Sequence, residues 1–127
     1  MRRMEAGSGT RALSGEARQA LLSVSEELKV PPGTELTSEG EFGYSFFLIE
    51  DGSCTVEQDG RALGTLGPGD FFGEVALLVT AKRSACVTAD TPMRVRAVFD
   101  QDFRRVLREH PDLEGTVRAA LTERFGN

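Results

Sequence analysis

The chain has 127 residues, 39% of them apolar and 28% charged, which is the size and composition of one globular domain. Its formal net charge is −5 and no block of Lys or Arg stands out, which argues against direct binding of nucleic acid. The longest apolar runs, 46–49 and 75–79, are far too short to cross a membrane.

Histidine and cysteine are scarce, and this limits the chemistry that the chain can perform. A single histidine, His110, and two cysteines, Cys54 and Cys86, cannot supply a zinc site of the usual kind or a disulfide framework. We expect both cysteines to be small core residues, which fits a cytoplasmic protein. The basic N-terminal residues are followed by no apolar segment, so they predict no secretory signal. We predict neither a metal nor a cofactor.

The N-terminal segment differs in composition from the rest. Residues 1–13 are polar and contain two glycines, and we expect them to form a flexible leader. A single domain is expected over 14–127. Ser14 is the predicted N-cap of a short helix that runs to about Val24.

Short apolar runs separated by glycines fill the middle of the chain. Nine of the fourteen glycines fall between Gly33 and Gly73, which is typical of tight turns between strands. Asp59-Gly60, between two alternating runs, predicts a hairpin. The predicted strands are 27–30, 35–38, 45–50, 54–58, 62–66, 84–89 and 93–99. Strands at this spacing predict a mainly β domain, either a sandwich or a jelly-roll barrel.

Helical periodicity returns after the strands. The apolar residues from Phe103 to His110 follow the spacing i, i+3, i+4, i+7, and Asp100 is the expected N-cap of this helix. Pro111 suits the first turn of a second helix, which we expect to end near Gly126. The domain should therefore end in two helices.

The segment 69–86 interrupts the β pattern and contains the candidate ligand site. Residues 74–78 favour a very short helix, whose start would expose free backbone N–H groups that can bind an anion. Arg83 follows and can meet the same anion with its planar fork. Glu74 can only accept hydrogen bonds when ionised, so its partner would be a hydroxyl group of that ligand. A phosphate and a sugar hydroxyl held close together describe a nucleotide.

At these residues the sequence resembles the cyclic nucleotide-binding domain family. The family's phosphate-binding cassette reads F-G-E-aliphatic-A-aliphatic, followed several residues later by R-(S/T/A)-A; here it is FGEVAL at 72–77 and RSA at 83–85. The step of nine residues from Glu74 to Arg83 also matches the family. The resemblance covers about 13–125. It implies a jelly-roll β-barrel (double-stranded β-helix) with an N-terminal helix, a short cassette helix and two C-terminal helices.

The resemblance also implies a role for each cassette residue. Arg83 would pair with the cyclic phosphate, which would also accept hydrogen bonds from the backbone of Ala76 and Ser84. Glu74, helped by the backbone of Gly73, would hold the ribose 2′-OH. Val75 would pack against the base or sugar. The implied ligand-binding set is Gly73, Glu74, Val75, Ala76, Arg83, Ser84 and Ala85.

Two features bear on which ligand binds and how it is enclosed. The hydroxyl of Ser84 could reach the phosphate or a guanine amino group, so cAMP and cGMP both stay open, and we place cAMP first.

Lys82 stands where the family often has proline. Many members cover the base with a lid residue on the last helix or beyond. Arg124 and Phe125 are the candidates here; otherwise the lid is missing or comes from another subunit.

We therefore expect a regulatory sensor and not an enzyme. The ligand would bind the cassette, and movement of the C-terminal helices would report it to an effector domain or a homodimer partner. The alternative is a nucleotide-free structural or protein-interaction domain with the same barrel, in which Glu74 and Arg83 form only an ion pair. A metal-dependent barrel enzyme of the cupin kind is disfavoured, because its site needs several histidines.

Overall fold

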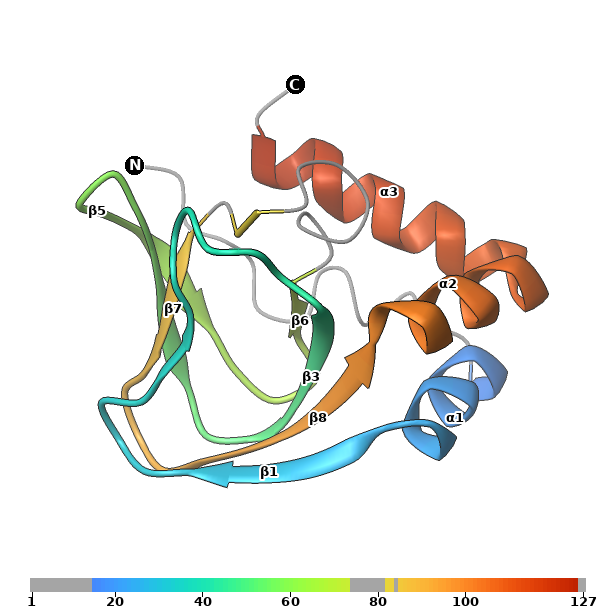
Figure 1. The fold of residues 1–127 in the computed structure, drawn as a ribbon, viewed down its shortest axis with the longest axis horizontal. Helices are drawn as coiled ribbons and strands as arrows, with labels where there is room; N and C mark the ends of the chain where they lie inside the picture. Colours follow the sequence, from blue (N-terminus) through green and yellow to red (C-terminus); the bar gives the residue numbers. More distant parts are fainter. Residues whose placement is uncertain (1–14, 74–81, 84, 126–127) are drawn as a thin grey trace.

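The computed structural model describes residues 15–73, 82–83 and 85–125, and the helices gather on one side of the strands (Figure 1). The elements in these ranges are α1 (Gly15–Ser23), β1 (Glu26–Val30), β2 (Glu35–Thr37), β3 (Ser45–Asp51), β4 (Cys54–Gln58), β5 (Arg61–Leu66), β6 (Phe71–Phe72), β7 (Cys86–Ala89), β8 (Met93–Phe99), α2 (Asp100–Glu109) and α3 (Pro111–Phe125).

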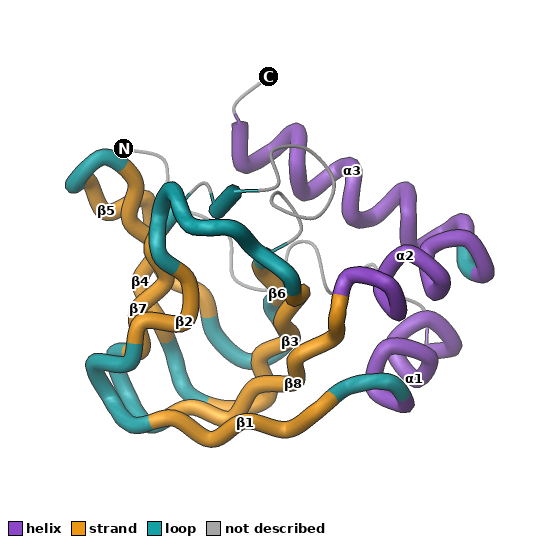
Figure 2. The backbone as a smooth tube through the Cα atoms, in the orientation of Figure 1, coloured by secondary structure: helices purple, strands orange, loops and turns teal. Residues whose placement is uncertain are grey.

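The strands form two four-stranded sheets in which every described pairing is antiparallel. The strand orders are β1-β8-β3-β6 and β2-β7-β4-β5. Strands that follow one another in the chain thus mostly fall in different sheets, as in a double-sheet jelly roll. Among the described residues no ladder joins the two sheets, so the predicted jelly-roll barrel is present here as two facing sheets and is not closed (Figure 2). The mainly β class with flanking helices is confirmed.

The space between the sheets is filled by every second residue of the strands, as the two-residue period of a strand requires. Phe47 and Ile49 point inward from β3, and Met93 and Val95 do so from β8. Cys54 lies in the same interior cluster, as expected, whereas Cys86 is only half-buried and its Sγ accepts a hydrogen bond from the backbone N–H of Glu39 over 3.3 Å.

The outer face of the β1-β8-β3-β6 sheet is partly covered by the helices. Phe46 and Leu48 of β3 and Val98 of β8 point outward and join a second buried cluster with residues of α1, α2 and α3. The ring of Phe46 stacks on that of Phe103 in α2, with centroids 4.4 Å apart. This cluster fixes the helical end of the domain to the sheet that carries β3.

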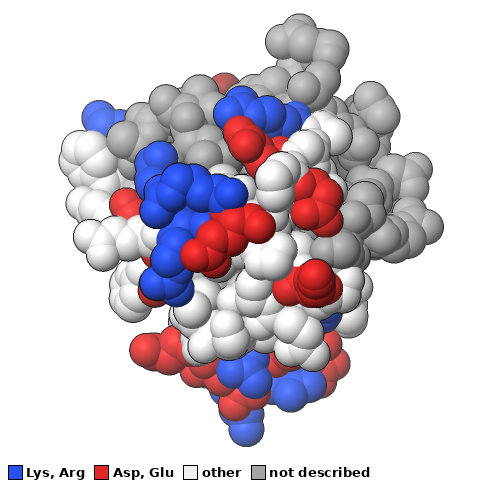
Figure 3. All heavy atoms as spheres, turned by 90° about the vertical axis from the view of Figure 1, so that its right-hand side faces the viewer, with Lys and Arg blue, Asp and Glu red and all other residues white. Residues whose placement is uncertain are grey.

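The view toward the helices shows acidic side chains next to basic ones on the described surface (Figure 3). Two such pairs lie within single helices: Arg105 reaches Asp102 over 3.3 Å in α2, and Arg118 reaches Glu114 over 2.9 Å in α3. Exposed pairs of this kind contribute little to stability. No helix within the described ranges is long and apolar enough to span a bilayer.

All seven predicted strands are present: 54–58 and 93–99 have the predicted ends, and the ends of the other five differ by at most two residues. The hairpin at Asp59-Gly60 is confirmed, since both residues have positive φ, 53° and 77°. The eighth strand, β6, was not predicted. It has only two residues, too few to show alternation, and it exists because Phe71 and Phe72 pair with Leu48 and Phe47 of β3.

The helix predictions need one correction. Asp100 is the first residue of α2 and not its N-cap; the N-cap is Phe99, which makes no capping hydrogen bond with its side chain. The reason is tertiary, because the backbone N–H of Asp100 donates to the carbonyl of Tyr44 over 3.0 Å. The helix α3 begins at Pro111, as predicted. The predicted caps Ser14 and Gly126 lie outside the described residues.

Candidate functional site

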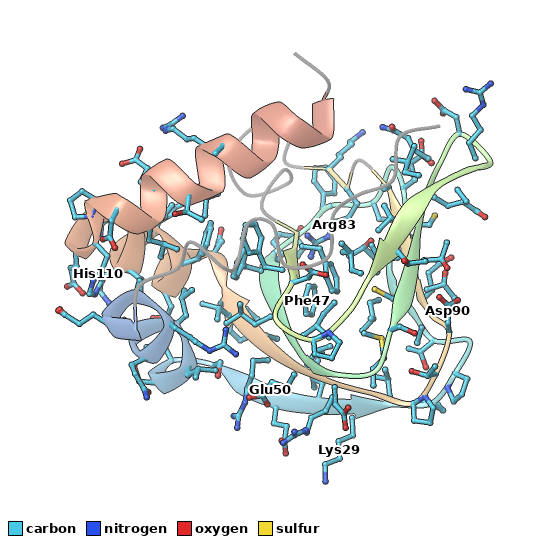
Figure 4. The ribbon with its side chains drawn as sticks, turned by 180° about the vertical axis from the view of Figure 1, so that it is seen from behind. Lys29, Phe47, Glu50, Arg83, Asp90 and His110 are labelled. Carbon is cyan, nitrogen blue, oxygen red and sulfur yellow. The ribbon has the colours of Figure 1, made fainter. Side chains whose placement is uncertain are left out.

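The side chain of Arg83 is buried, with 8% of its surface exposed, where the ends of β3 and β6 meet. Its Nη1 donates to the carbonyl oxygen of Gly73 over 3.2 Å, and its Nη2 donates to that of Ser45 over 2.9 Å. In Figure 4 the labelled side chains of Arg83 and Phe47 lie near each other. The guanidinium thus connects the first residue of β3 with the residue that follows β6.

The backbone of Arg83 is held in place by the segment that precedes β3. Its N–H donates to the carbonyl of Glu41 over 2.6 Å, and its own carbonyl accepts from Gly40 over 2.9 Å. One residue earlier, Lys82 forms an isolated antiparallel bridge with Phe42, and its Nζ lies 5.4 Å from the centroid of that ring. These contacts fix the point from which the Arg83 side chain starts.

An aromatic ring lies against the guanidinium. The central carbon of the Arg83 guanidinium is 5.6 Å from the centroid of Phe47, which is within the range of a cation–π interaction. The Phe47 ring stacks in turn on Phe72, with centroids 4.8 Å apart and an interplanar angle of 19°. The contacts of the side chain thus include two carbonyl oxygens and the ring of Phe47, which is itself stacked on Phe72.

Gly73 is required by its position beside the arginine. Its φ of +97° is in the region that side chains rarely adopt. A Cβ at this residue would lie 2.7 Å from the carbonyl oxygen of Ser45 and 2.9 Å from Nη1 of Arg83. The structure thus brings Gly73 and Arg83 together, as the sequence predicted, and leaves no room for a larger residue at 73.

The other predicted site residues have different outcomes. Ala85 is half-buried and packs against the interior cluster, and its carbonyl accepts a hydrogen bond from Oγ1 of Thr37 over 2.8 Å. The candidate lid residues Arg124 and Phe125 fall in α3, but their side chains lie outside the described part of the structure. Four cassette residues also lie outside the described ranges: Glu74, Val75, Ala76 and Ser84.

This arrangement is suited to holding an anion. The two carbonyls that accept from Arg83 orient its fork. A cation shielded from water attracts an anion more strongly than an exposed one does, and its planar fork matches a phosphate. The described residues bring together no group of three His, Cys, Asp or Glu side chains that could hold a metal ion.

Two contributors to the site were not predicted from the sequence. Ser45 takes part through its backbone carbonyl, for which a side-chain pattern carries no signal. Phe47 lies in a predicted strand, and strand alternation could have placed it on the inner face. Its contact with Arg83 spans 36 positions in the sequence, a relationship that follows from the fold.

The fold and the site together define a class: a two-sheet β domain with helices against one sheet and a buried arginine held by backbone carbonyls. More specifically, the chain belongs to the cyclic nucleotide-binding domain family, whose sequence model matches residues 27–110.

Similar proteins include regulatory and channel proteins that are much longer. The chain is 44% identical over 80 residues to a cAMP-dependent protein kinase regulatory subunit of Yarrowia lipolytica, covering 61% of this chain and 21% of that protein. It is 34% identical over 110 residues to a cyclic nucleotide-gated potassium channel of Rhizobium etli, covering 84% of this chain and 31% of the channel. The chain therefore spans less than a third of either relative.

Solved structures agree on the fold. The crystal structure of the Thermus thermophilus catabolite activator protein matches with a TM-score of 0.80 and 28% identity, and the match covers 93% of this chain and 58% of that one. The resemblance seen in the cassette residues is thereby confirmed at the level of family and of fold.

Proposed function

We propose that this chain is a regulatory sensor module that binds a cyclic nucleotide, cAMP ahead of cGMP, with the cyclic phosphate on Arg83. The observation that carries the proposal is the buried fork of Arg83, oriented by the carbonyls of Gly73 and Ser45 and by the ring of Phe47. A group that is already ordered loses little conformational entropy when the ligand arrives, and this favours affinity.

The remaining cassette residues complete the proposed site. Glu74 would accept from the ribose 2′-OH, Val75 would contact the base or sugar, and the backbone of Ala76 and Ser84 would donate to the phosphate. The short helix predicted over 74–78 would supply further N–H groups. We place cAMP first because several relatives, including the Yarrowia lipolytica protein, are cAMP-dependent kinase regulatory subunits by name.

The output would be a change in the position of the C-terminal helices. Ser45, which accepts from Arg83, pairs with Phe99 at the end of β8, and α2 begins at the next residue. A phosphate that draws the fork of Arg83 toward itself would alter the bond to Ser45 and hence the start of α2. The helices would act on an effector domain or a homodimer partner, with Arg124 or Phe125 as the lid. The ligand would be released unchanged.

The decisive experiment is a thermal-shift titration with cAMP, cGMP and 5′-AMP. A ligand at a hundredfold excess over its Kd adds about 2.7 kcal/mol to the free energy of unfolding, which raises Tm by roughly 10 °C for a domain of this size. We expect the shift with a cyclic nucleotide, its absence with 5′-AMP, and its loss in Arg83→Ala.

Arg96→Ala is the matched control, because Arg96 pairs with Glu50 over 3.0 Å and not with the site. It should keep the ligand-induced shift. If no cyclic nucleotide shifts Tm, or if Arg83→Ala responds like the parent protein, the proposed function is wrong and the nucleotide-free interaction domain takes its place.

A further inference from the structure

We propose that Phe47 is a positioning residue for the anion site: its ring sets the orientation of the Arg83 guanidinium. This inference rests on the proposed function, because the phosphate is the anion that the oriented fork would bind. Phe47 is not one of the cassette residues, and it lies 36 positions before Arg83 in the chain.

The fork of Arg83 is held by contacts of two kinds, hydrogen bonds at its two ends and an aromatic ring against the group. Nη1 is held by Gly73 and Nη2 by Ser45, so the two ends of the fork are fixed. The ring of Phe47, with its centroid 5.6 Å from the central carbon, adds a contact at a third point of the group. Three points that do not lie on one line define the plane of the guanidinium.

The ring can do this because it is itself immobile. Phe47 is buried, with 7% of its surface exposed, and it stacks on Phe72. Phe72 directly precedes Gly73, whose carbonyl holds Nη1, and Phe47 follows Ser45 by two positions on the same strand. The two rings therefore belong to the β3–β6 pairing, the two carbonyls lie beside it in the chain, and together they position the fork.

The ring contact also suits a ligand-binding state. The guanidinium has five N–H donors, more than its bonds to the two carbonyls use. The face of an aromatic ring attracts the cation through its quadrupole and uses none of those donors. The interaction with Phe47 can therefore persist when a phosphate binds, and it limits how far the group moves.

The chain offers a matched comparison one residue away. Lys82 lies 5.4 Å from the ring centroid of Phe42, but Phe42 is 60% exposed. The distance from the cation to the ring centroid is similar in the two pairs, but the ring of Phe42 is exposed and that of Phe47 is buried. Phe42→Leu removes an exposed pair beside the site, whereas Phe47→Leu removes the buried one. A third variant, Val95→Ala, makes a cavity in the interior cluster that contains Phe47.

The test compares the affinity for cAMP with that for adenosine, each measured by competition with a fluorescent cAMP analogue. Adenosine has no phosphate, so the ratio of the two affinities isolates what the phosphate contributes. In Phe47→Leu we expect cAMP to bind about threefold to thirtyfold more weakly while adenosine is unchanged. Phe42→Leu and Val95→Ala should keep the parental ratio of the two affinities. Phe47→Tyr should keep it too, because this substitution retains the ring. If Phe47→Leu does not fold, Phe47→Met replaces it as a variant of similar volume.

A double variant shows whether Phe47 acts through Arg83. In an Arg83→Lys background the fork is gone, so adding Phe47→Leu should weaken cAMP binding no further. A full additional loss in the double variant would overturn the inference, as would a parental ratio in Phe47→Leu.

A measurement without ligand separates this inference from the proposed function. In protein with labelled arginine, the Nε–H resonance of Arg83 should carry a ring-current shift and exchange slowly with water. Both properties should move toward those of an exposed arginine in Phe47→Leu and not in Phe42→Leu. If the parent protein binds no cyclic nucleotide, the proposed function fails and this measurement alone decides the inference. An unchanged Arg83 resonance in Phe47→Leu would show that the ring does not position the fork.

Discussion

Arg83 and Ser45, 38 positions apart in the sequence, are joined by a hydrogen bond of 2.9 Å from Nη2 of the guanidinium to the main-chain carbonyl of the serine. Ser45 begins β3 and pairs with Phe99, the last residue of β8. The proposed phosphate-binding side chain is therefore bonded to the strand pair from which the C-terminal helices continue. This relationship connects the site to the part of the fold that we propose to move.

Gly73→Ala should damage both the fold and the site. The added methyl group would sit at a φ of +97°, 2.7 Å from the Ser45 carbonyl oxygen and 2.9 Å from Nη1 of Arg83. We expect the free energy of unfolding to fall by about 1–3 kcal/mol in a denaturant titration. The control is Gly33→Ala, where φ is +87° but a Cβ would meet nothing within 4 Å. Equal losses of stability and of cAMP affinity in the two variants would contradict the prediction.

Arg83→Lys should keep the positive charge and lose the fork. A lysine cannot donate to two acceptors in one plane as the guanidinium does to Gly73 and Ser45. We expect the affinity for cAMP to fall about 10- to 100-fold in calorimetry, with a smaller effect on thermal stability. Arg96→Lys, at the ion pair with Glu50, should bind cAMP as the parent protein does. Parental affinity in Arg83→Lys would mean that charge alone is sufficient.

Phe103→Ala should loosen α2 from the sheet. The ring of Phe103 is fully buried and stacks on Phe46 at a centroid distance of 4.4 Å. Its removal should cost about 3–5 kcal/mol of unfolding free energy, because a cavity replaces the ring. Gln101→Ala, at an exposed position of the same helix, should change stability by less than about 0.5 kcal/mol. A small loss for Phe103→Ala would show that α2 packs on the sheet by other contacts.

The proposed helix movement can be measured directly. Spin labels at Lys29 on β1 and Arg118 on α3, both exposed, would report the distance between the sheet and the last helix. Cys54 and Cys86 would first be replaced by alanine. We expect saturating cAMP to change the mean distance by about 2 Å or more, since helix shifts in switching proteins are of this order. A control pair at Lys29 and Arg61, on the two sheets, should not change. An identical distance distribution with and without cAMP would exclude α3 as the moving element.

The features predicted well from the sequence are those that neighbouring residues decide. Strand alternation and turn residues located seven strands, and Asp59-Gly60 formed the expected hairpin because both residues accept positive φ. Pro111 marked the first residue of α3 for a similarly local reason, its fixed φ. The order and spacing of the cassette residues indicated the family, and the match of the family's sequence model to residues 27–110 confirms it.

The features that the sequence did not reveal depend on contacts between distant residues. The strand β6 exists because Phe71 and Phe72 pair with β3, and Phe99 holds the N-cap position of α2 while it still pairs with β3. The sequence predicts Arg83 as the anion-binding residue, but the contacts of Arg83 with Ser45 and Phe47 come from tertiary packing. Local propensities are set by each residue and its near neighbours, whereas a buried side chain is oriented by whatever the fold brings beside it. The sequence by itself therefore determined the family and most of the elements, and only the tertiary structure decided β6 and how the arginine is held.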